Sequence, residues 1–139
     1  MLRQVWWHHI AIMKIAMIIV RALMGLLFIF AAVVVLFNLV APPPEFPNEI
    51  ARKFNEGIFA PPYFIKLLKI TELLCGIAFV AGRYVPLATV VIAPVIINIF
   101  LYHAFVDTSG LPVAIFLVLA NIFVAYYYRQ SYAGLLAAK

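Results

Sequence analysis

The sequence has few charged residues, and acidic residues are the scarcest of them. Charged residues make up 11% of the 139 positions, with five Asp and Glu against ten Lys and Arg. A soluble domain is about a quarter charged and about half apolar, whereas 68% of this chain is hydrophobic. A domain of this size cannot bury so much apolar surface in water. The composition therefore excludes a soluble globular protein and predicts an all-α integral membrane protein with one domain, residues 1–139.

Cysteine is nearly absent as well. The single Cys75 excludes an intrachain disulfide and a Cys-x-x-Cys redox pair, and its apolar neighbours indicate ordinary packing. The chain also lacks a phosphate-binding loop, a Gly-x-Ser-x-Gly motif and a His-Glu-x-x-His motif. His103 is the one histidine expected at membrane depth, so neither a haem ligand pair nor another metal site is predicted. These absences argue against an enzyme that acts alone.

The basic residues are scattered singly and never form a run with interleaved aromatic residues. This pattern excludes a nucleic-acid interface, and basic residues that flank membrane segments account for the positive net charge. If the amino terminus is cytoplasmic, the inner side holds basic residues and no acidic one: Arg3, Lys14, Arg83, Arg129 and Lys139. The outer side then holds charges of both signs: Arg52, Lys53, Glu45, Glu49, Glu56 and Asp107. We therefore predict that both termini are cytoplasmic.

Four apolar segments each approach the roughly 20 residues that a helix needs to cross a bilayer. We predict helices over about 15–41, 63–81, 84–106 and 111–128. The joints after the second and third segments, 81–83 and 107–110, are short and polar, as in tight turns between helices. Short joints place neighbouring helices in opposite directions, so the prediction is an antiparallel four-helix transmembrane bundle.

The segment between the first two helices, residues 41–62, is bounded by prolines and has an amphipathic pattern. Apolar residues recur every four positions, while charged residues fill the other faces. We predict a short amphipathic helix over about 46–58, which is either a lid on the bundle or a docking surface for a partner protein. The docking candidates are the apolar residues of this pattern: Phe46, Ile50, Phe54 and Ile58.

Polar residues within the four segments are the candidate functional residues, because each costs free energy in lipid unless it is paired or hydrated. The candidates for a buried polar network or a ligand site are Arg21, Lys69, Glu72, Asn98, His103 and Asn121. Lys66 is closer to the helix end and is interpreted as an anchor that reaches the headgroups. Counting residues from the helix ends places Glu72, Asn98 and Asn121 in one layer near the midplane.

Glu72 has two candidate partners: Arg21 on the first helix and Lys69 three residues earlier on its own helix. Gly25 and Gly76 are expected to let the first and second helices approach closely. Asn98 and His103 differ by about 140° around an ideal helix, so whether both face the bundle interior is left open. The network is equally compatible with holding the bundle together and with holding a ligand.

The order of these motifs resembles that of the DoxX family of small four-helix bacterial membrane proteins. The shared pattern is Arg-x-x-x-Gly at 21–25, Lys-x-x-Glu-x-x-x-Gly at 69–76, Gly-Arg at 82–83, and Asn followed by His at 98 and 103. The resemblance implies a location in the bacterial cytoplasmic membrane. The family is named for a membrane subunit associated with a terminal quinol oxidase and with thiosulfate:quinone oxidoreductase. The cysteine pair that serves quinone chemistry in the related four-helix vitamin K epoxide reductase is absent here.

Two functional hypotheses follow from the residues and the resemblance together. In the first, the protein is an accessory subunit of a quinone-linked respiratory or redox membrane complex, with other membrane-protein subunits as partners. In the second, it is a stand-alone carrier or binding protein for a quinone, a lipid or another small hydrophobic solute. The polar residues of the helices then line a pocket that the amphipathic segment closes.

Overall fold

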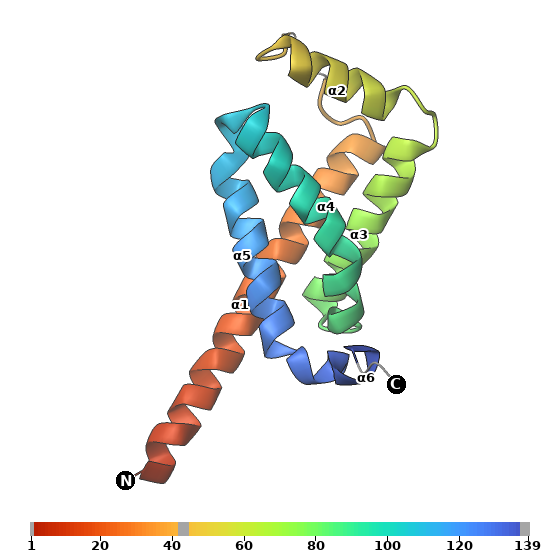
Figure 1. Ribbon diagram of the computed structural model, residues 1–139. Coiled ribbons are helices and arrows are strands. Elements are labelled where there is room, and N and C mark those ends of the chain that lie inside the picture. Colours follow the sequence, from red (N-terminus) through yellow and green to blue (C-terminus); the bar gives the residue numbers. More distant parts are fainter. Residues whose placement is uncertain (1, 42–44, 137–139) are drawn as a thin grey trace.

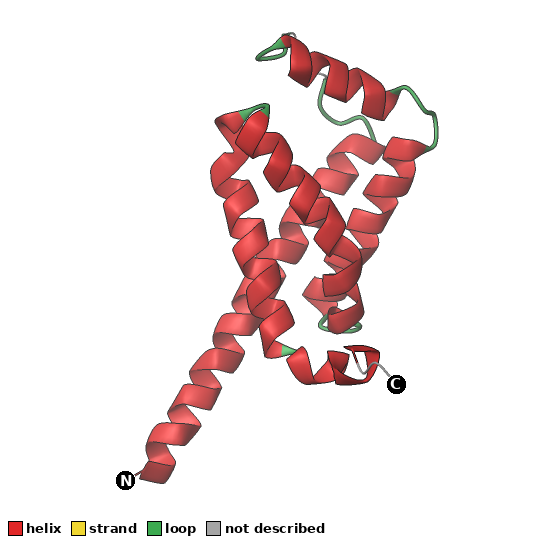
Figure 2. Ribbon diagram, viewed as in Figure 1, coloured by secondary structure: helices red, strands yellow, loops and turns green. Residues whose placement is uncertain are grey.

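The computed structural model describes residues 2–41 and 45–136, and within these ranges the fold is built from helices with no strand (Figures 1 and 2). The elements are α1 (Leu2–Leu36), α2 (Glu49–Phe59), α3 (Phe64–Ala81), α4 (Val85–Phe105), α5 (Leu111–Tyr127) and α6 (Ala133–Leu136). Two short 3₁₀ helices, Thr108–Gly110 and Arg129–Tyr132, precede α5 and α6. The predicted all-α class is confirmed.

Three helical stretches are long and apolar enough to cross a membrane: Ala11–Leu36, Val85–Phe105 and Thr108–Tyr127. The fourth long helix, α3, has 18 residues and carries the charged residues Lys66, Lys69 and Glu72. The chain is therefore a multi-pass membrane protein by the length and composition of its helices. The charges of α3 set it apart from its neighbours, and most of them belong to the site described below.

The predicted first helix, 15–41, is displaced toward its amino terminus in the structure. α1 begins at Leu2, because no proline or capping residue interrupts the helix before residue 15, and it ends at Leu36. Asn38 adopts a left-handed conformation with φ 51°, and the N–H of Leu39 donates to the carbonyl of Val34 at 2.9 Å. This is the Schellman arrangement, in which a left-handed residue closes the last helical turn.

The other predicted boundaries differ little from the structure. The ranges 63–81, 84–106 and 111–128 differ from α3, α4 and α5 by at most one residue at either end. The predicted turn at 81–83 is formed by Gly82, whose φ of 71° is left-handed. The amphipathic helix begins three residues later than predicted, at Glu49, because Asn48 caps it and accepts a hydrogen bond from the N–H of Ala51 at 2.8 Å.

The core forms where α1, α3, α4 and α5 pack together, and α1 and α3 share the most extensive contact. A Cβ atom on Gly25 would lie 2.7 Å from the carbonyl oxygen of Gly76, so the predicted close approach of the two helices is confirmed. Buried apolar side chains fill the remaining space: Met24, Phe28, Phe79, Ile92 and Val124. The single cysteine, Cys75, belongs to this core, as its apolar neighbours indicated.

α2 lies across one end of the molecule, at the opposite end from the α3–α4 turn (Figure 1). Its first turn is tied to α4, because the Asn48 side chain donates a hydrogen bond to the carbonyl oxygen of Val106 at 2.7 Å. Its outward face carries an exposed ion-pair network in which Arg52 contacts Glu49 and Glu56 at 2.6 and 2.7 Å. The predicted amphipathic character of this segment is confirmed, and its inner face covers the space between α3 and α4.

Candidate functional site

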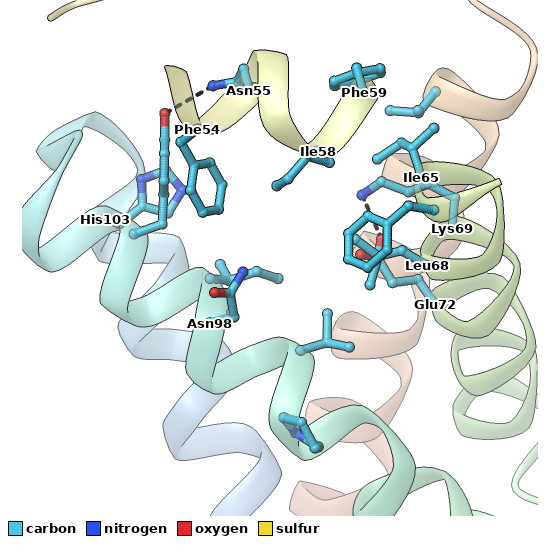
Figure 3. A pocket seen from close by; sticks show the side chains of 16 residues that line it. Phe54, Asn55, Ile58, Phe59, Ile65, Leu68, Lys69, Glu72, Asn98 and His103 are labelled. Carbon is cyan, nitrogen blue, oxygen red and sulfur yellow. Dashed lines mark hydrogen bonds and ion pairs between the residues drawn. The ribbon is translucent and has the colours of Figure 1, made fainter. Parts of the chain in front are cut away.

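A cavity of about 580 Å³ lies beneath α2, between the ends of α3 and α4 (Figure 3). Most of its wall is apolar, and a few polar side chains interrupt it. The polar lining residues are Asn55, Lys69, Glu72, Asn98, Tyr102 and His103. Four of the six candidates from the sequence therefore line one cavity. Lys69 and Glu72 lie on α3, and Asn98 and His103 lie on α4.

The α3 wall carries an ion pair. The Lys69 Nζ atom lies 2.8 Å from the Glu72 Oε2 atom, and the two side chains are 16% and 2% exposed. The spacing of three residues places both on one face of the helix. Of the two partners considered for Glu72, the structure selects Lys69. The pair is neutral as a whole, and it presents both a donor and an acceptor to the cavity.

The α4 wall faces this pair with an amide, a phenol and an imidazole. Asn98 and Tyr102 are one helical turn apart and share a face of α4. His103 lies beside Tyr102, with the two rings edge to face at 5.2 Å between centroids. Asn98 and His103 therefore both line the cavity, which answers the question left open by their angular separation. The cavity is wide enough to receive side chains from two adjoining faces of the helix.

The orientation of His103 follows from its contacts. Its Nδ1 atom lies 2.7 Å from the carbonyl oxygen of Asp107. Because a carbonyl oxygen can only accept, the Nδ1–H group of His103 is the donor in this contact. The ring packs directly against Gly110, where any side chain would overlap it. His103 is thus held in one orientation by the turn between α4 and α5.

The roof of the cavity is the inner face of α2. Phe54 and Ile58 point into the cavity, and the Phe54 ring packs on the Tyr102 ring at 4.8 Å between centroids (Figure 3). Asn55 donates to the Tyr102 hydroxyl at 3.4 Å and to the carbonyl oxygen of Ala51 at 2.8 Å. In addition to the Asn48–Val106 hydrogen bond, the roof therefore contacts α4 through one aromatic pair and one long hydrogen bond.

The four docking candidates do not share one face. Phe54 and Ile58 line the cavity, Phe46 lines a second hollow between α2 and the end of α1, and Ile50 is 63% exposed. A spacing of four residues drifts by about 40° per step around a helix. The inner face instead follows the three-and-four spacing of Ala51, Phe54, Asn55 and Ile58. Docking of a partner through these residues stays a prediction, and Ile50 is the most accessible of them.

Arg21 and Asn121, the other two candidates, lie outside the cavity. The guanidinium of Arg21 packs against Gly82 in the α3–α4 turn, away from Glu72. Asn121 is partly buried on α5, and its Oδ1 atom is enclosed without a hydrogen-bond partner among the described residues. The layer predicted from depth alone is therefore divided: Glu72 and Asn98 share the cavity, and Asn121 does not line it.

Two polar residues of the site, Tyr102 and Asn55, were missed as candidates in the sequence. Tyr102 was a detectable member, since it follows Asn98 by four residues and so shares its helical face. Asn55 stands four residues after Ala51, which is fully buried, but an alanine in an amphipathic segment does not reveal which face is inward. The inward position of Asn55 is set by the packing of α2 over α4, which brings it to Tyr102.

The arrangement suits binding rather than bond making by the protein alone. The cavity offers a donor and an acceptor on α3, an amide, a phenol and an imidazole on α4, and apolar surface between them. Among the described residues no group of three or more His, Cys, Asp or Glu side chains has the arrangement of a metal site. A molecule with an apolar body and a polar end meets complementary groups here.

Comparison with known proteins gives one relationship. The family model described as DoxX matches residues 16–106 of the chain. All the residues that line the cavity, from Val35 to His103, fall within the matched range. No curated protein and no solved structure matched the chain.

Proposed function

The chain belongs to the DoxX family, and on that premise we propose that it is a membrane-embedded binding protein for a small amphipathic molecule. The ligand class is a quinone, a lipid or another hydrophobic solute with a polar end. The observation that carries the proposal is the cavity of about 580 Å³ beneath α2, which combines an apolar wall with convergent polar groups. Binding sites for small molecules have volumes of roughly 300–1,000 Å³ and the same kind of lining.

Polar groups on both walls of the cavity are available to bind the polar end of the ligand. Lys69 and Glu72 offer a donor and an acceptor from one wall, and Asn98 offers both from the other. His103 adds an imidazole ring to the same wall. The apolar body of the ligand then lies between Phe54, Ile58 and Leu68, beneath the roof. A hydrogen bond formed here is strengthened because lipid and apolar side chains exclude competing water.

The test is direct binding of hydrophobic probes by the full chain in detergent or nanodiscs. Two probes separate the ligand classes: a fluorescent fatty acid and a short-chain quinone. The double variant Lys69→Met/Glu72→Leu removes the polar pair without leaving an unpaired charge, and we expect about tenfold weaker binding of the preferred probe. Lys66→Met is the matched control, because Lys66 is exposed on the same helix and does not line the cavity. Equal binding by the double variant, or no saturable binding of either probe, contradicts the proposal.

The proposal includes a topology. We place α1, α3, α4 and α5 across the bilayer as an antiparallel four-helix bundle, with both termini on the cytoplasmic side of a bacterial inner membrane. The support is the distribution of charge: Arg83 and Arg129 follow α3 and α5 at one end, and the α2 network at the other end contains charges of both signs. Lys14 is exposed on α1, and Lys139 lies outside the described residues. Cysteine labelling of Ser109 and Ser131 from each side of the membrane tests this orientation.

A second candidate function is that of an accessory subunit in a quinone-linked respiratory or redox membrane complex. The observation in its favour is an exposed apolar face on the first half of α1, a helix whose amino-terminal part extends beyond the other helices (Figure 1). Ile12, Ile15 and Ile19 are 63%, 58% and 53% exposed. A helix surface of this kind can pack against a neighbouring membrane helix as well as against lipid.

Purification from native membranes after mild crosslinking separates the two candidates. An accessory subunit is recovered with a redox protein, and the substitution of Ile12 and Ile15 by serine lowers that recovery. Recovery of the wild-type chain without any redox partner contradicts this second function and leaves the binding function standing.

A further inference from the structure

A cation without a counter-ion lies at the end of the molecule opposite the cavity. Arg21 is only partly exposed, and its Nε atom is fully enclosed without a hydrogen-bond partner among the described residues. Among the described residues Arg21 also forms no ion pair. A guanidinium removed from water loses hydration that only an anion or strong acceptors can replace. The enclosed Nε donor of Arg21 therefore lacks an acceptor among the described residues.

The chain's acidic side chains cannot supply this partner. The sequence has five of them: Glu45, Glu49, Glu56, Glu72 and Asp107. Glu72 is paired with Lys69, ten residues or about 15 Å along α3 from Gly82. The other four belong to the α2 end, which the 18 residues of α3 separate from Gly82 by about 27 Å. An arginine side chain spans less than half of that separation.

The α3–α4 turn is shaped around the Arg21 guanidinium. A Cβ atom on Gly82 would lie 2.6 and 2.8 Å from Nη1 and Nη2 of Arg21, so Gly82 leaves the room that the guanidinium occupies. The next residue, Arg83, is exposed and brings a second guanidinium to the same turn. Arg129 lies at this end as well, but it already stacks on the Tyr126 ring at 4.5 Å and donates to the Tyr126 carbonyl. The residue next to Gly82 thus carries a second guanidinium, and among the described residues no carboxylate forms an ion pair with Arg21 or Arg83.

We propose that Arg21 and Arg83 form a binding site for a phosphate group, separate from the cavity beneath α2. Guanidinium groups bind phosphate oxygens through parallel hydrogen bonds, and two neighbouring arginines match its negative charge. The site lies where α3 ends and α4 begins, at the level of an aromatic belt that includes Tyr84 and Tyr126. The phosphate is supplied either by an anionic phospholipid headgroup or by a free phosphate in solution.

The proposal does not depend on the function proposed for the cavity. Arg21 and Arg83 do not line that cavity, and an empty or non-binding cavity leaves their unbalanced charge unchanged. The two ideas therefore fail independently. Loss of probe binding in the Lys69 and Glu72 variants says nothing about phosphate, and the experiment below uses variants at the other end of the molecule.

The experiment measures thermal unfolding and lipid binding by native mass spectrometry, using the full chain in zwitterionic micelles. One arm adds phosphatidylglycerol, a second adds phosphatidylcholine, and a third adds inorganic phosphate. We expect phosphatidylglycerol or inorganic phosphate to raise the unfolding temperature, whereas phosphatidylcholine leaves it unchanged. A rise in the first arm identifies a lipid headgroup, and a rise confined to the third identifies free phosphate.

Variants decide whether Arg21 carries the effect. Arg21→Gln is expected to bind the effective anion about tenfold more weakly, and Arg83→Gln also weakens it. Gly82→Ala displaces the Arg21 guanidinium and is also expected to weaken anion binding. Gly134→Ala is its control, because nothing lies within 4 Å of a Cβ atom at Gly134. Lys66→Gln removes one positive charge at the other end and is expected to retain full binding.

If Arg21→Gln does not fold, Arg21→Lys keeps the charge but loses the paired donors, and its weaker binding provides the same information. The proposal is overturned if wild-type protein responds to no anion, or if the Arg21 variants bind as wild type does. It is also overturned if Lys66→Gln lowers binding as much as Arg21→Gln, because the effect would then be general electrostatic attraction.

Discussion

Gly25 on α1 and Gly76 on α3 lie so close that neither has room for a side chain. A Cβ atom on Gly76 would be 2.8 Å from the carbonyl oxygen of Gly25, and one on Gly25 would be 2.7 Å from that of Gly76. Backbone atoms cannot move aside as the end of a side chain can. This contact therefore fixes the distance between the two helices that pack most extensively, and it fixes where the α3 wall of the cavity stands.

The substitution Gly76→Ala is predicted to destabilise the protein by about 1–3 kcal/mol, because the helices must separate to admit the methyl group. Gly57→Ala is the control, since nothing lies within 4 Å of a Cβ atom at Gly57. Alanine is also the better helix former, by about 1 kcal/mol. Thermal unfolding in one detergent compares the two variants, and an equal effect of both would contradict the close-packing argument.

The cavity is predicted to close when its roof is enlarged. Ile58→Trp places an indole where Ile58 now lines the cavity, so binding of hydrophobic probes should fall by tenfold or more while the fold is retained. Ile50→Trp makes the same change on the exposed side of α2 and should leave binding unchanged. Saturation binding with both variants tests this, and a similar loss in both would show that α2 is disturbed generally.

Replacing one member of the Lys69–Glu72 pair is predicted to lower the free energy of unfolding more than replacing both. Glu72→Gln leaves Lys69 without its counter-ion in a site where Glu72 is 2% exposed, and we expect a loss of about 3 kcal/mol or more. The double variant Lys69→Met/Glu72→Leu should lose less, because no charge remains unpaired. Unfolding free energies in urea compare them. A double variant that is less stable than the single one would contradict this account of the pair.

Asn48 is predicted to hold the roof in place through two separable interactions. Its Oδ1 atom caps α2 by accepting from the N–H of Ala51, and its Nδ2 atom donates to the carbonyl oxygen of Val106. Asn48→Ala loses both, at a cost of about 1 kcal/mol from the cap alone. Asn48→Asp keeps the cap and loses the donor. Trypsin cleavage at Arg52 or Lys53 should be fastest in Asn48→Ala and intermediate in Asn48→Asp, and unchanged cleavage in both would show that other contacts hold α2.

Acid is predicted to weaken the α2 end of the molecule. Hydrogen bonds from Ser109 lower the pKa of Asp107, and the Arg52 guanidinium lowers that of Glu49. A carboxyl group whose pKa is lower in the folded state than in the unfolded state stabilises the folded state at pH values above its unfolded pKa of about 4. This stabilisation is lost as the pH falls through the lower, folded-state pKa. The unfolding temperature should therefore fall between pH 5 and pH 3, roughly the window that these shifts define. Asp107→Asn/Glu49→Gln should flatten that fall, and an unchanged slope would contradict the assignment.

The sequence by itself determined the membrane class, the ranges of α3, α4 and α5, and the close approach of α1 and α3. Long apolar runs admit no other structure in lipid, and paired glycines at matching depths leave room only for another backbone. Proline and glycine marked the turns, so α3, α4 and α5 were predicted to within one residue at each end. The predicted range of α1, 15–41, was wrong at both ends: the helix begins at Leu2 and ends at Leu36. Its end was missed because a left-handed Asn38 is not distinguishable in sequence from a helical one.

Only the tertiary structure decided which polar residues meet. Depth along a helix placed Glu72, Asn98 and Asn121 in one layer, but the rotation of each helix, set by packing, brought two of them together and left Asn121 elsewhere. The length of Arg21 allowed it to extend toward Glu72 or toward Gly82, and the space left by a glycine in the turn selected Gly82. The inner face of α2 was likewise decided by its contacts with Tyr102 and Val106, because four-residue spacing in a short helix does not specify a face.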